Sequence, residues 1–591
     1  MITDTSAASE EKSIQAEDAP DQIWKRWMKE ISISSKAEDS WRKDAKHIID
    51  IYKNAKSNIR FNILYSNVQT VGPALYLNTP RPDVRRRFSD EDLAAKEVSE
   101  TIERVLIAGV DNYDFDYNIK GVVLDYQLTG RGMGWVSYEP LTTSQPVIDE
   151  MGMPVLDAMG VPAVQEEIVY QSTTCKWIEW DDVRFGHASR WEDTPWISIE
   201  HSFTREELVE KFGQLGAEIK LDLSYTEDTE EKKEAIKKAC VYEIWSKTDR
   251  KIYFIAPSFD KGPLLVKDDP FKLEGFYPCP RPLLYVTEPD GQSPIIEYNL
   301  YKDLAEELNN VSKRIGRLTS AMKARGVYDS QVTGFAQAMS GDDAALIPSD
   351  NATVAMQMGG LDKAIWMIPV DKYVQVLREL YQAREQIKQS IYEVTGISDI
   401  VRGASDPRET LGAQSLKAQF GGLRIKERQK DVQRFIRDIF RIKAEIIAQK
   451  FEPNILKLYT GKDITPEAFD LMKSAVNRMI RVDVETDSTI AQDAEADKKS
   501  ITELIAAITQ FITAWGPIIQ SGLVPLEVPK ALLMSATRRH QMGREVEDAL
   551  NKIGQQQLSP PGIPPMMGAQ ASPGLPPEAV PATPMMNNVN A

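Results

Sequence analysis

The chain has 591 residues, of which 42% are hydrophobic and 27% are charged, and its formal net charge at pH 7 is −17. This length exceeds what one ordinary hydrophobic core supports, so we expect two to four packed regions and exclude a single small module. The composition is that of a folded, water-facing protein. The negative charge makes the average surface repel nucleic acid, so any contact with DNA must be local or weak.

The sequence contains no signal for a membrane, a cofactor or a metal. The longest apolar stretch, residues 504–519, contains Thr and Gln and is shorter than the roughly 20 residues of a membrane span. The acidic N-terminus lacks the basic start and apolar run of a signal peptide, so we expect the protein to stay in the cytoplasm where it is made. Neither the histidines nor the cysteines have metal-ligand spacing, and we expect free thiols at Cys175, Cys240 and Cys279.

The first half of the chain is predicted to contain helices and then strands. Residues 1–19 are predicted to be disordered, and apolar periodicity predicts helices from 20 to about 78, from 89, and over about 115–129. Alternating or β-branched runs then predict antiparallel strands at 134–140, 166–180, 196–203, 240–256 and 262–268. Prolines at 146, 154 and 162 recur every eight residues, which predicts a protruding hairpin or ribbon over 141–170.

The most regular segment is a heptad seam, which predicts a helix of about 28 residues, roughly 40 Å long. Its residues are Leu300, Leu304, Leu308, Val311, Ile315, Leu318 and Met322. A Gly-, Ser- and Asp-rich patch follows at 327–360, with short strands expected around Leu346 and Val354. A second stripe then predicts another long helix. Its residues are Val374, Leu377, Tyr381, Ile387, Ile391 and Val394.

The stretch GISDIVRGAS, residues 396–405, interrupts two helical segments. Gly396 can end the first helix, and Asp406 followed by Pro407 is a strong N-terminal signal for a helix that continues to about Lys450. We therefore predict a specified loop, with an ordinary interhelical turn as the alternative. One edge strand is expected at 479–489, helices at 493–553, and a disordered Pro- and Met-rich tail after them.

Three kinds of pattern could carry chemistry, and each has a structural explanation that we favour. GRGMG (130–134) lies in the order helix, glycines, strand, whereas a phosphate cradle needs a helix after the glycines. Asp483, Glu485 and Asp487 could bind a divalent metal, but alternate residues of one strand do not easily meet on one ion. The basic clusters at 81–87, 323–325 and 424–437 are mixed with or flanked by acids, as on solvated or intersubunit faces. Because no nucleophile and base are paired, we expect no catalytic residue and no enzyme.

Five stretches, taken in order, resemble the bacteriophage portal (head-to-tail connector) proteins, closest to those of short-tailed phages. They are FNILYSNVQTVGPALYLNTPRPDVRRR (61–87), VVLDYQLTGRGMGWVSYEP (122–140), YPCPRPLLYV (277–286), IYEVTGISDIVRGAS (391–405) and VDVETDST (482–489). The resemblance covers nearly everything from about residue 22 to 553. It implies an α+β, predominantly helical fold with a wing, a two-helix stem, a clip, a tunnel loop and a helical crown.

The resemblance implies a twelve-subunit ring at one capsid vertex, through which a terminase motor pumps DNA that later leaves by the same channel. By position, the parts follow one another along the chain. They are the wing (20–296, with the 141–170 ribbon), a stem helix (297–325), the clip (326–370), a second stem helix (371–396), the tunnel loop (397–405), a long helix with the return strand of the wing (406–492), the crown (493–553) and a disordered tail (554–591).

The resemblance also implies site residues and partners. The DNA-facing residues of the tunnel loop would be Ile397, Asp399, Ile400, Arg402 and Ser405, and stem and clip contacts would be Lys313, Arg314, Arg317, Lys323 and Arg325. The partners would be further copies of the chain, terminase, adaptor or tail proteins, major capsid and scaffold proteins, and non-specifically bound double-stranded DNA, in a virion assembled in the host cytoplasm. We expect no cofactor and no membrane contact. Two alternatives are a nucleotide-dependent DNA enzyme that uses the 130–134 loop, and a helical scaffold or adaptor of another assembly.

Overall fold

The structure of the chain is a computed structural model. The described residues are 19–54, 59–86, 92–111, 114–146, 164–225, 236–287, 293–322, 326–328, 365–367, 370–397 and 423–484, with a few positions between 502 and 513. The chain divides into two units, residues 1–491 and 492–591, and every element named here belongs to the first. The predicted N-terminal disorder, crown and tail lie outside the described residues or at those few positions.

Five helices form the first part of the fold, as the apolar periodicity predicts. They are α1 (Pro20–Ala37), α2 (Asp39–Lys53), α3 (Ile63–Leu75), α4 (Leu93–Asp111) and α5 (Phe115–Thr129). Local signals set their ends: Asn54 adopts a left-handed conformation after α2, and the Asn62 side chain accepts a hydrogen bond from the Tyr65 backbone N–H at the start of α3.

The strands pair in antiparallel fashion throughout the described residues, in agreement with the predicted antiparallel sheet. One sheet has the order β10-β2-β3, and its strands are β10 (Leu283–Leu284), β2 (Arg131–Pro146) and β3 (Val164–Ile178). The second sheet contains β4 (Val183–Phe185), β5 (Trp196–Phe203), β7 (Ile236–Ser246), β8 (Lys251–Ile255) and β9 (Leu265–Asp268), with β6 (Leu223–Tyr225) beside β7. The β2–β3 pairing runs out to Pro146 and Val164, which confirms the base of the predicted hairpin; its tip is outside the described residues.

Several short elements belong to the same unit. They are the helices α6 (Arg205–Phe212) and α7 (Gln214–Glu218), the 3₁₀ helices η1 (Trp191–Asp193) and η2 (Glu297–Leu300), and the strand pairs β11 (Val286–Thr287) with β12 (Pro294–Ile295) and β1 (Pro82–Arg86) with β15 (Ile480–Val484). The β1–β15 pair joins segments far apart in the chain and confirms residues 480–484 of the strand predicted at 479–489; residues 485–489 lie outside the described residues.

Most of the described residues after residue 300 are helical. They are α8 (Lys302–Ala321), α12 (Val370–Thr395), α14 (Leu423–Lys450), α15 (Pro453–Thr460) and α16 (Pro466–Met479), and between α8 and α12 lies the strand pair β13 (Gly326–Tyr328) and β14 (Ile365–Met367). The fold is therefore a mixed α+β fold.

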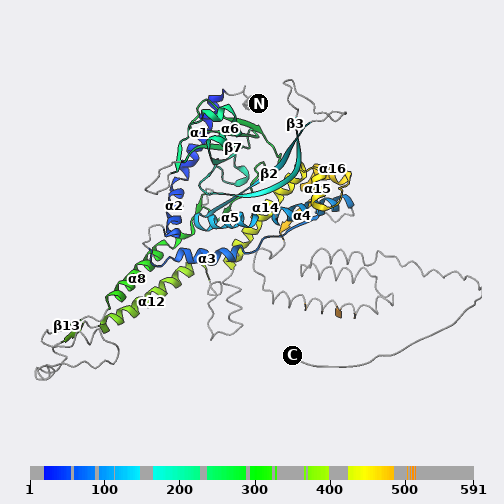
Figure 1. Ribbon diagram of the computed structural model, residues 1–591. Coiled ribbons are helices and arrows are strands. Elements are labelled where there is room, and N and C mark those ends of the chain that lie inside the picture. Colours follow the sequence, from blue (N-terminus) through cyan, green and yellow to red (C-terminus); the bar gives the residue numbers. More distant parts are fainter. Residues whose placement is uncertain are drawn as a thin grey trace, which may run out of the picture. The chain divides into compact units, whose positions relative to one another are not determined.

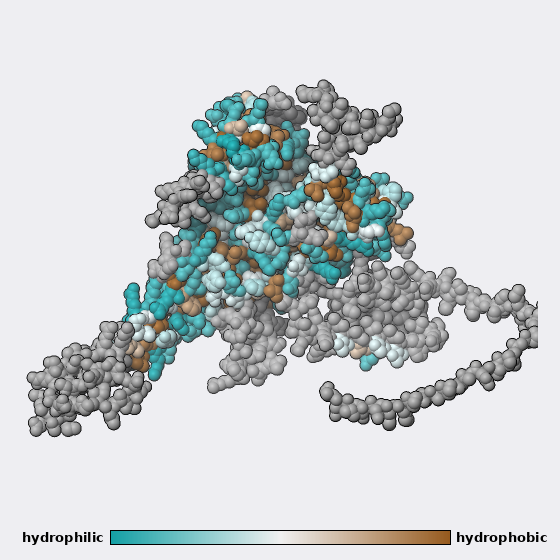
Figure 2. All heavy atoms as spheres, viewed as in Figure 1, coloured by the Kyte–Doolittle hydropathy of each residue, from teal (hydrophilic) through white to brown (hydrophobic). Residues whose placement is uncertain are grey.

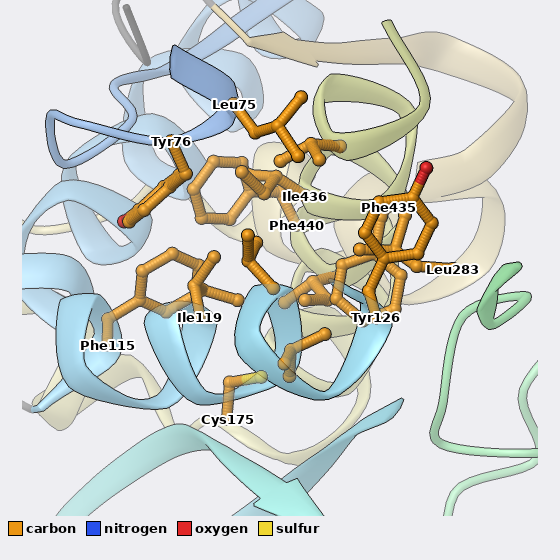
Figure 3. Packing of buried hydrophobic residues seen from close by; sticks show 14 of the residues in the cluster. Leu75, Tyr76, Phe115, Ile119, Tyr126, Cys175, Leu283, Phe435, Ile436 and Phe440 are labelled. Carbon is orange, nitrogen blue, oxygen red and sulfur yellow. The ribbon is translucent and has the colours of Figure 1, made fainter. Parts of the chain in front are cut away.

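The main core forms around α14, α5 and the β2–β3 sheet (Figure 3). On α14, Val432, Phe435, Ile436, Ile439 and Phe440 are all fully buried, and the Phe440 ring stacks on that of Phe115 at 5.5 Å between centroids. Burying each such side chain stabilises the fold by roughly 1.5–3 kcal/mol, so this helix organises the first unit. A second core lies against β5, β7 and β8, where Ile197, Val241 and Trp245 are buried.

Two sequence predictions about the long helices need correction. Leu300 does not belong to the heptad seam: it lies in η2, is 52% exposed, and precedes a helix of 20 residues instead of about 28. On α12, Val374, Tyr381 and Val394 are exposed, and the buried seam is formed by Leu377, Leu380, Ile387 and Ile391. The predicted stripe combined residues from neighbouring rows on the surface of α12. Only the row that faces α8 and the main core is buried.

Candidate functional site

The paired helices α8 and α12 lie side by side and are the most distinctive arrangement in the described fold (Figure 1). Ile315 of α8 packs with Leu377 and Leu380 of α12, and partly buried Val311, Leu318 and Met322 complete this contact. Leu308, Ile387 and Ile391 instead join the main core. Later residues of α8 therefore meet earlier residues of α12, and the pair is antiparallel.

The outer face of α8 carries charges of both signs. Arg314 and Arg317, predicted as stem contacts, are exposed, and Lys313 is half-buried. The exposed acids Glu306 and Glu307 lie about two to three turns earlier on the same helix. Lys323 and Arg325, the other predicted contacts, lie outside the described residues. The structure thus brings three of these five basic residues together on one helix.

Gly316 allows the chain before α3 to lie directly on α8. A Cβ atom at this position would be 1.8 Å from Arg60 Nη1, so any other residue would displace the guanidinium group. The backbone N–H of Arg60 also donates to Asn309 Oδ1 at 2.9 Å. The segment just before α3 therefore contacts α8 beyond the first turn of that helix.

The two described ends of the segment that contains the predicted tunnel loop are held together. Helix α12 ends at Thr395, and Gly396 adopts φ +72°, as the sequence predicts for the end of this helix. The Arg424 Nη1 group donates to the Val394 carbonyl at 3.1 Å, and a Cβ on Gly396 would lie 2.7 Å from Arg424 Cδ. The residues just before this segment, Val394–Gly396, therefore lie next to Arg424, which is just after it.

Ile397 was predicted to face DNA, but in the structure its side chain is buried, so this prediction needs correction. Its side chain is 5% exposed and belongs to the main core, because the turn at Gly396 directs the chain toward α14 and burial of an apolar side chain is favourable. Asp399, Ile400, Arg402 and Ser405 lie outside the described residues, as do Asp406 and Pro407, the predicted start of the next helix.

A partly buried ion pair joins the start of α14 to the root of α8. Arg428 forms a two-pronged contact with Glu297, with Nη2 at 2.7 Å from Oε1 and Nη1 at 3.3 Å from Oε2. Arg428 also donates to the Tyr285 hydroxyl, and its guanidinium lies 4.2 Å from the centre of that ring. We call Arg428, Glu297 and Tyr285 the root clamp.

The electrostatics of the root clamp follow from its burial. Burial raises the pKa of Tyr285 to about 12, and the Glu297 carboxylate adds to this effect. Burial alone would lower the pKa of Arg428, but Glu297 more than compensates, so that pKa lies above its ordinary value. Sequence reasoning missed the clamp, because its two charges are 131 residues apart and no local pattern connects them.

The GRGMG loop is a structural turn, as the order of elements predicts. Gly130 has φ +81° and ends α5, and β2 begins at the next residue. A Cβ on Gly132 would lie 2.2 Å from the Val122 carbonyl oxygen, so this glycine serves close packing of strand on helix. No helix N-terminus follows the glycines, which contradicts the use of this loop as a phosphate cradle.

Arg131 of the same loop is committed to a buried ion network. It is 1% exposed, its Nη1 lies 2.6 Å from Glu38 Oε1, and its guanidinium stacks over the Trp41 ring at 4.1 Å. Arg42 contacts the other oxygen of Glu38 at 2.7 Å. Burial raises the pKa of Glu38, but the charges of Arg131 and Arg42 outweigh it and hold the pKa below its ordinary value. This arginine is unavailable to a bound phosphate.

The remaining candidates show no reactive arrangement within the described residues. Asp483 lies on β15 and contacts Arg481 at 3.0 Å, whereas Glu485 and Asp487 lie outside the described residues. The described part of the chain holds no cluster of three or more His, Cys, Asp or Glu side chains that could bind a metal ion. All three cysteines are buried and form no disulfide, in agreement with the predicted free thiols.

Comparisons add no family to these observations. No protein-family model matches the chain, and a comparison with curated proteins gives no significant match. Among the described helices, none has both the length and the apolar character needed to cross a membrane.

Proposed function

We propose that the chain is the subunit of a portal ring, which forms the channel for packaging and ejection of a viral genome at one capsid vertex. The observation that carries the proposal is the antiparallel α8–α12 pair. Its helices are linked through the β13–β14 strand pair, and α12 leads into a segment whose ends meet at Arg424, at the start of α14. This order corresponds to stem, clip, stem, tunnel loop and long helix in the family that the sequence resembles.

The charge distribution supports a conduit more than a DNA-binding surface. The net charge is −17, and each phosphate contact made by a lysine or arginine would add affinity through counterion release. A channel through which DNA slides must keep that affinity low. The proposal therefore requires only weak, non-specific contact between the channel and DNA.

In this proposal, the wing, stem, clip, tunnel loop and crown have the residue ranges given by the resemblance. Terminase docks first and adaptor or tail proteins later, and capsid and scaffold proteins surround the ring in the virion. No enzymatic activity is assigned. The nucleotide-dependent alternative loses its support because the 130–134 glycines serve packing and Arg131 is paired. A helical scaffold or adaptor is the second candidate, since its helices would also pack side by side.

Electron microscopy of the purified protein, together with mass photometry, tests the proposal. We expect closed rings with a central channel wide enough for duplex DNA. A protein that remains monomeric or dimeric even with scaffold protein present contradicts the proposal, and rings or filaments without such a channel support the scaffold alternative.

Deletion of residues 400–405 tests the tunnel-loop assignment. We expect the deletion variant to assemble rings as the wild type does but to package or retain less DNA. If this variant packages and retains full-length genomes normally, the tunnel loop lies elsewhere.

A further inference from the structure

A cavity of about 270 Å³ lies where the end of α2, the start of α3 and the first turns of α8 meet. Figure 1 shows these three helices converging, and two hydrogen bonds cross the junction: Arg60 N–H donates to Asn309, and Asn299 donates to Asp44 at 3.4 Å. The volume is slightly below the roughly 300–1,000 Å³ of pockets that hold drug-sized molecules, so a ligand of this cavity must be small.

The inner part of the cavity is apolar. Its lining residues Ile63, Leu64 and Ala305 are between 2% and 6% exposed, and the half-buried ring of Phe61 lies beside the same space. Elsewhere on the visible face of the molecule, hydrophobic residues lie among hydrophilic ones (Figure 2), as on most folded proteins. The cavity instead gathers apolar side chains around one space, which favours a ligand whose inner part is apolar.

Two amide side chains in the cavity wall already hydrogen-bond to the backbone. Asn62 Nδ2 donates to the Ile51 carbonyl at 2.8 Å, and Asn62 Oδ1 accepts from the Tyr65 N–H at 3.1 Å. Asn309 Oδ1 accepts from the Arg60 N–H at 2.9 Å. A polar ligand group taken among the buried apolar residues would lose its water partners, which costs free energy. An aliphatic chain avoids that cost.

The mouth of the cavity carries negative charge. Its exposed lining residues are His47, Asp50 and Glu306, and neither carboxylate forms an ion pair with another described residue. No described residue of the lining is a lysine or an arginine. Lys388 lies 5.9 Å from the centre of the Phe61 ring but is paired with an acid of its own helix. The mouth therefore attracts a cation.

We propose that this cavity binds a small alkylammonium ion, with its aliphatic chain inside and its single ammonium group beside Asp50 and Glu306. A diamine, or a lysine side chain of another protein, would enter with a charged end first, and an ammonium among buried apolar residues loses its hydration. The bound ion would touch α2, α3 and α8 at once and stabilise their junction by mass action. This inference goes beyond the proposed function and does not depend on it.

Saturation-transfer NMR of the full chain with four six-carbon probes tests the chemistry of the ligand. We expect hexylamine to bind with a dissociation constant of about 1 mM and to receive most saturation at its methyl end. Hexanol should bind about three- to fivefold more weakly, and hexanoate and 1,6-diaminohexane at least about tenfold more weakly. Hexanoate that matches hexylamine overturns the inference. A diamine that binds as tightly also overturns it, because general attraction to a chain of net charge −17 would then suffice.

Substitutions at the mouth test the location of the site. Glu306→Gln removes one of its charges, and Glu307→Gln, at an exposed acid outside the lining, is the matched control. Because both side chains are exposed, thermal unfolding without ligand should match the wild type. We expect Glu306→Gln to weaken hexylamine about threefold and to leave hexanol unchanged, and the control to change neither.

The double variant Asp50→Asn with Glu306→Gln should bind hexylamine and hexanol equally. Equal effects of Glu306→Gln and Glu307→Gln, or a double variant that still prefers hexylamine as the wild type does, overturn the inference. Ring formation has no part in these measurements, so their outcome is independent of the proposed function.

Discussion

Helices α8 and α12 share one seam but differ in their outer surfaces and in how their ends near α14 are held. The partly buried Arg428–Glu297 ion pair fixes the root of α8, whereas the polar contact at the end of α12 is a hydrogen bond from exposed Arg424 to the Val394 carbonyl. The outer side of α8 is charged, whereas α12 also exposes the apolar side chains of Val374, Val376, Tyr381 and Val394. The heptad period of each helix therefore predicts the face that packs within the chain, whereas the outer surface of each helix has its own composition.

Removing the root clamp should have the largest effect. Arg428→Ala leaves the Glu297 carboxylate partly buried without its cation, and we expect a loss of about 3 kcal/mol in the free energy of unfolding. Urea unfolding measures this loss. Arg441→Ala, on the exposed side of the same helix, is the control and should change stability by less than about 0.5 kcal/mol. Equal stability of the two variants would show that α8 is not held at its root.

Lys443 is a buried charge on α14, in the main core and away from the α8–α12 pair. Lys443 is 1% exposed, its ammonium has no hydrogen-bond partner among the described residues, and it lies 5.0 Å from the centre of the Phe115 ring. Burial lowers its pKa to about 8, although the neighbouring Cys175 opposes this. We expect Lys443→Met to stabilise the protein at pH 7 by roughly 3 kcal/mol.

The sign of the pH dependence follows from this lowered pKa. Between pH 8 and the ordinary lysine value of 10.5, the unfolded chain binds the proton that the folded chain has released, so wild-type stability rises with pH. The advantage of Lys443→Met should be constant below about pH 8 and should fall by roughly 1 kcal/mol by pH 9. Urea unfolding at pH 7, 8 and 9 checks this. An advantage that is independent of pH up to 9 would mean that the folded protein keeps Lys443 charged throughout this range, so that burial does not lower its pKa to about 8.

A buried seam residue of α12 and an exposed residue beside it should respond differently to truncation to alanine. Leu377→Ala removes a side chain that is 8% exposed and packs on Ile315, and we expect a loss of about 2 kcal/mol. Val374→Ala, one turn earlier and 42% exposed, should change the stability of the single chain by less than about 0.5 kcal/mol. Thermal unfolding at low protein concentration makes this comparison, and a similar loss in both variants would place Val374 in the seam.

The smallest expected effect concerns the end of α12. Arg424→Ala removes one exposed hydrogen bond to the Val394 carbonyl, so we expect a loss of about 0.5–1 kcal/mol. Amide hydrogen exchange of the last turn of α12 should rise, while exchange at the start of α8 should stay unchanged. Increased exchange at α8 would show that the two ends are coupled.

Much of the secondary structure was predictable because it depends on neighbours in the chain. The strand at 196–203, the turn at Gly130 and the end of α12 before Gly396 are all where local pattern and glycine conformation predict them. The seam of α8 was also predictable from Leu304 onward, since the period of a helix is set by its backbone.

Only the tertiary structure decided which surfaces and charges meet. Leu300 leaves the seam, Ile397 is buried, and the predicted stripe of α12 separates into buried and exposed residues, because burial depends on which elements lie opposite. The pairing of Arg428 with Glu297 and the isolation of Lys443 likewise depend on segments that fold together from distant parts of the chain. Local pattern determines a helix and its period, and packing against distant segments determines what each of its faces can bind.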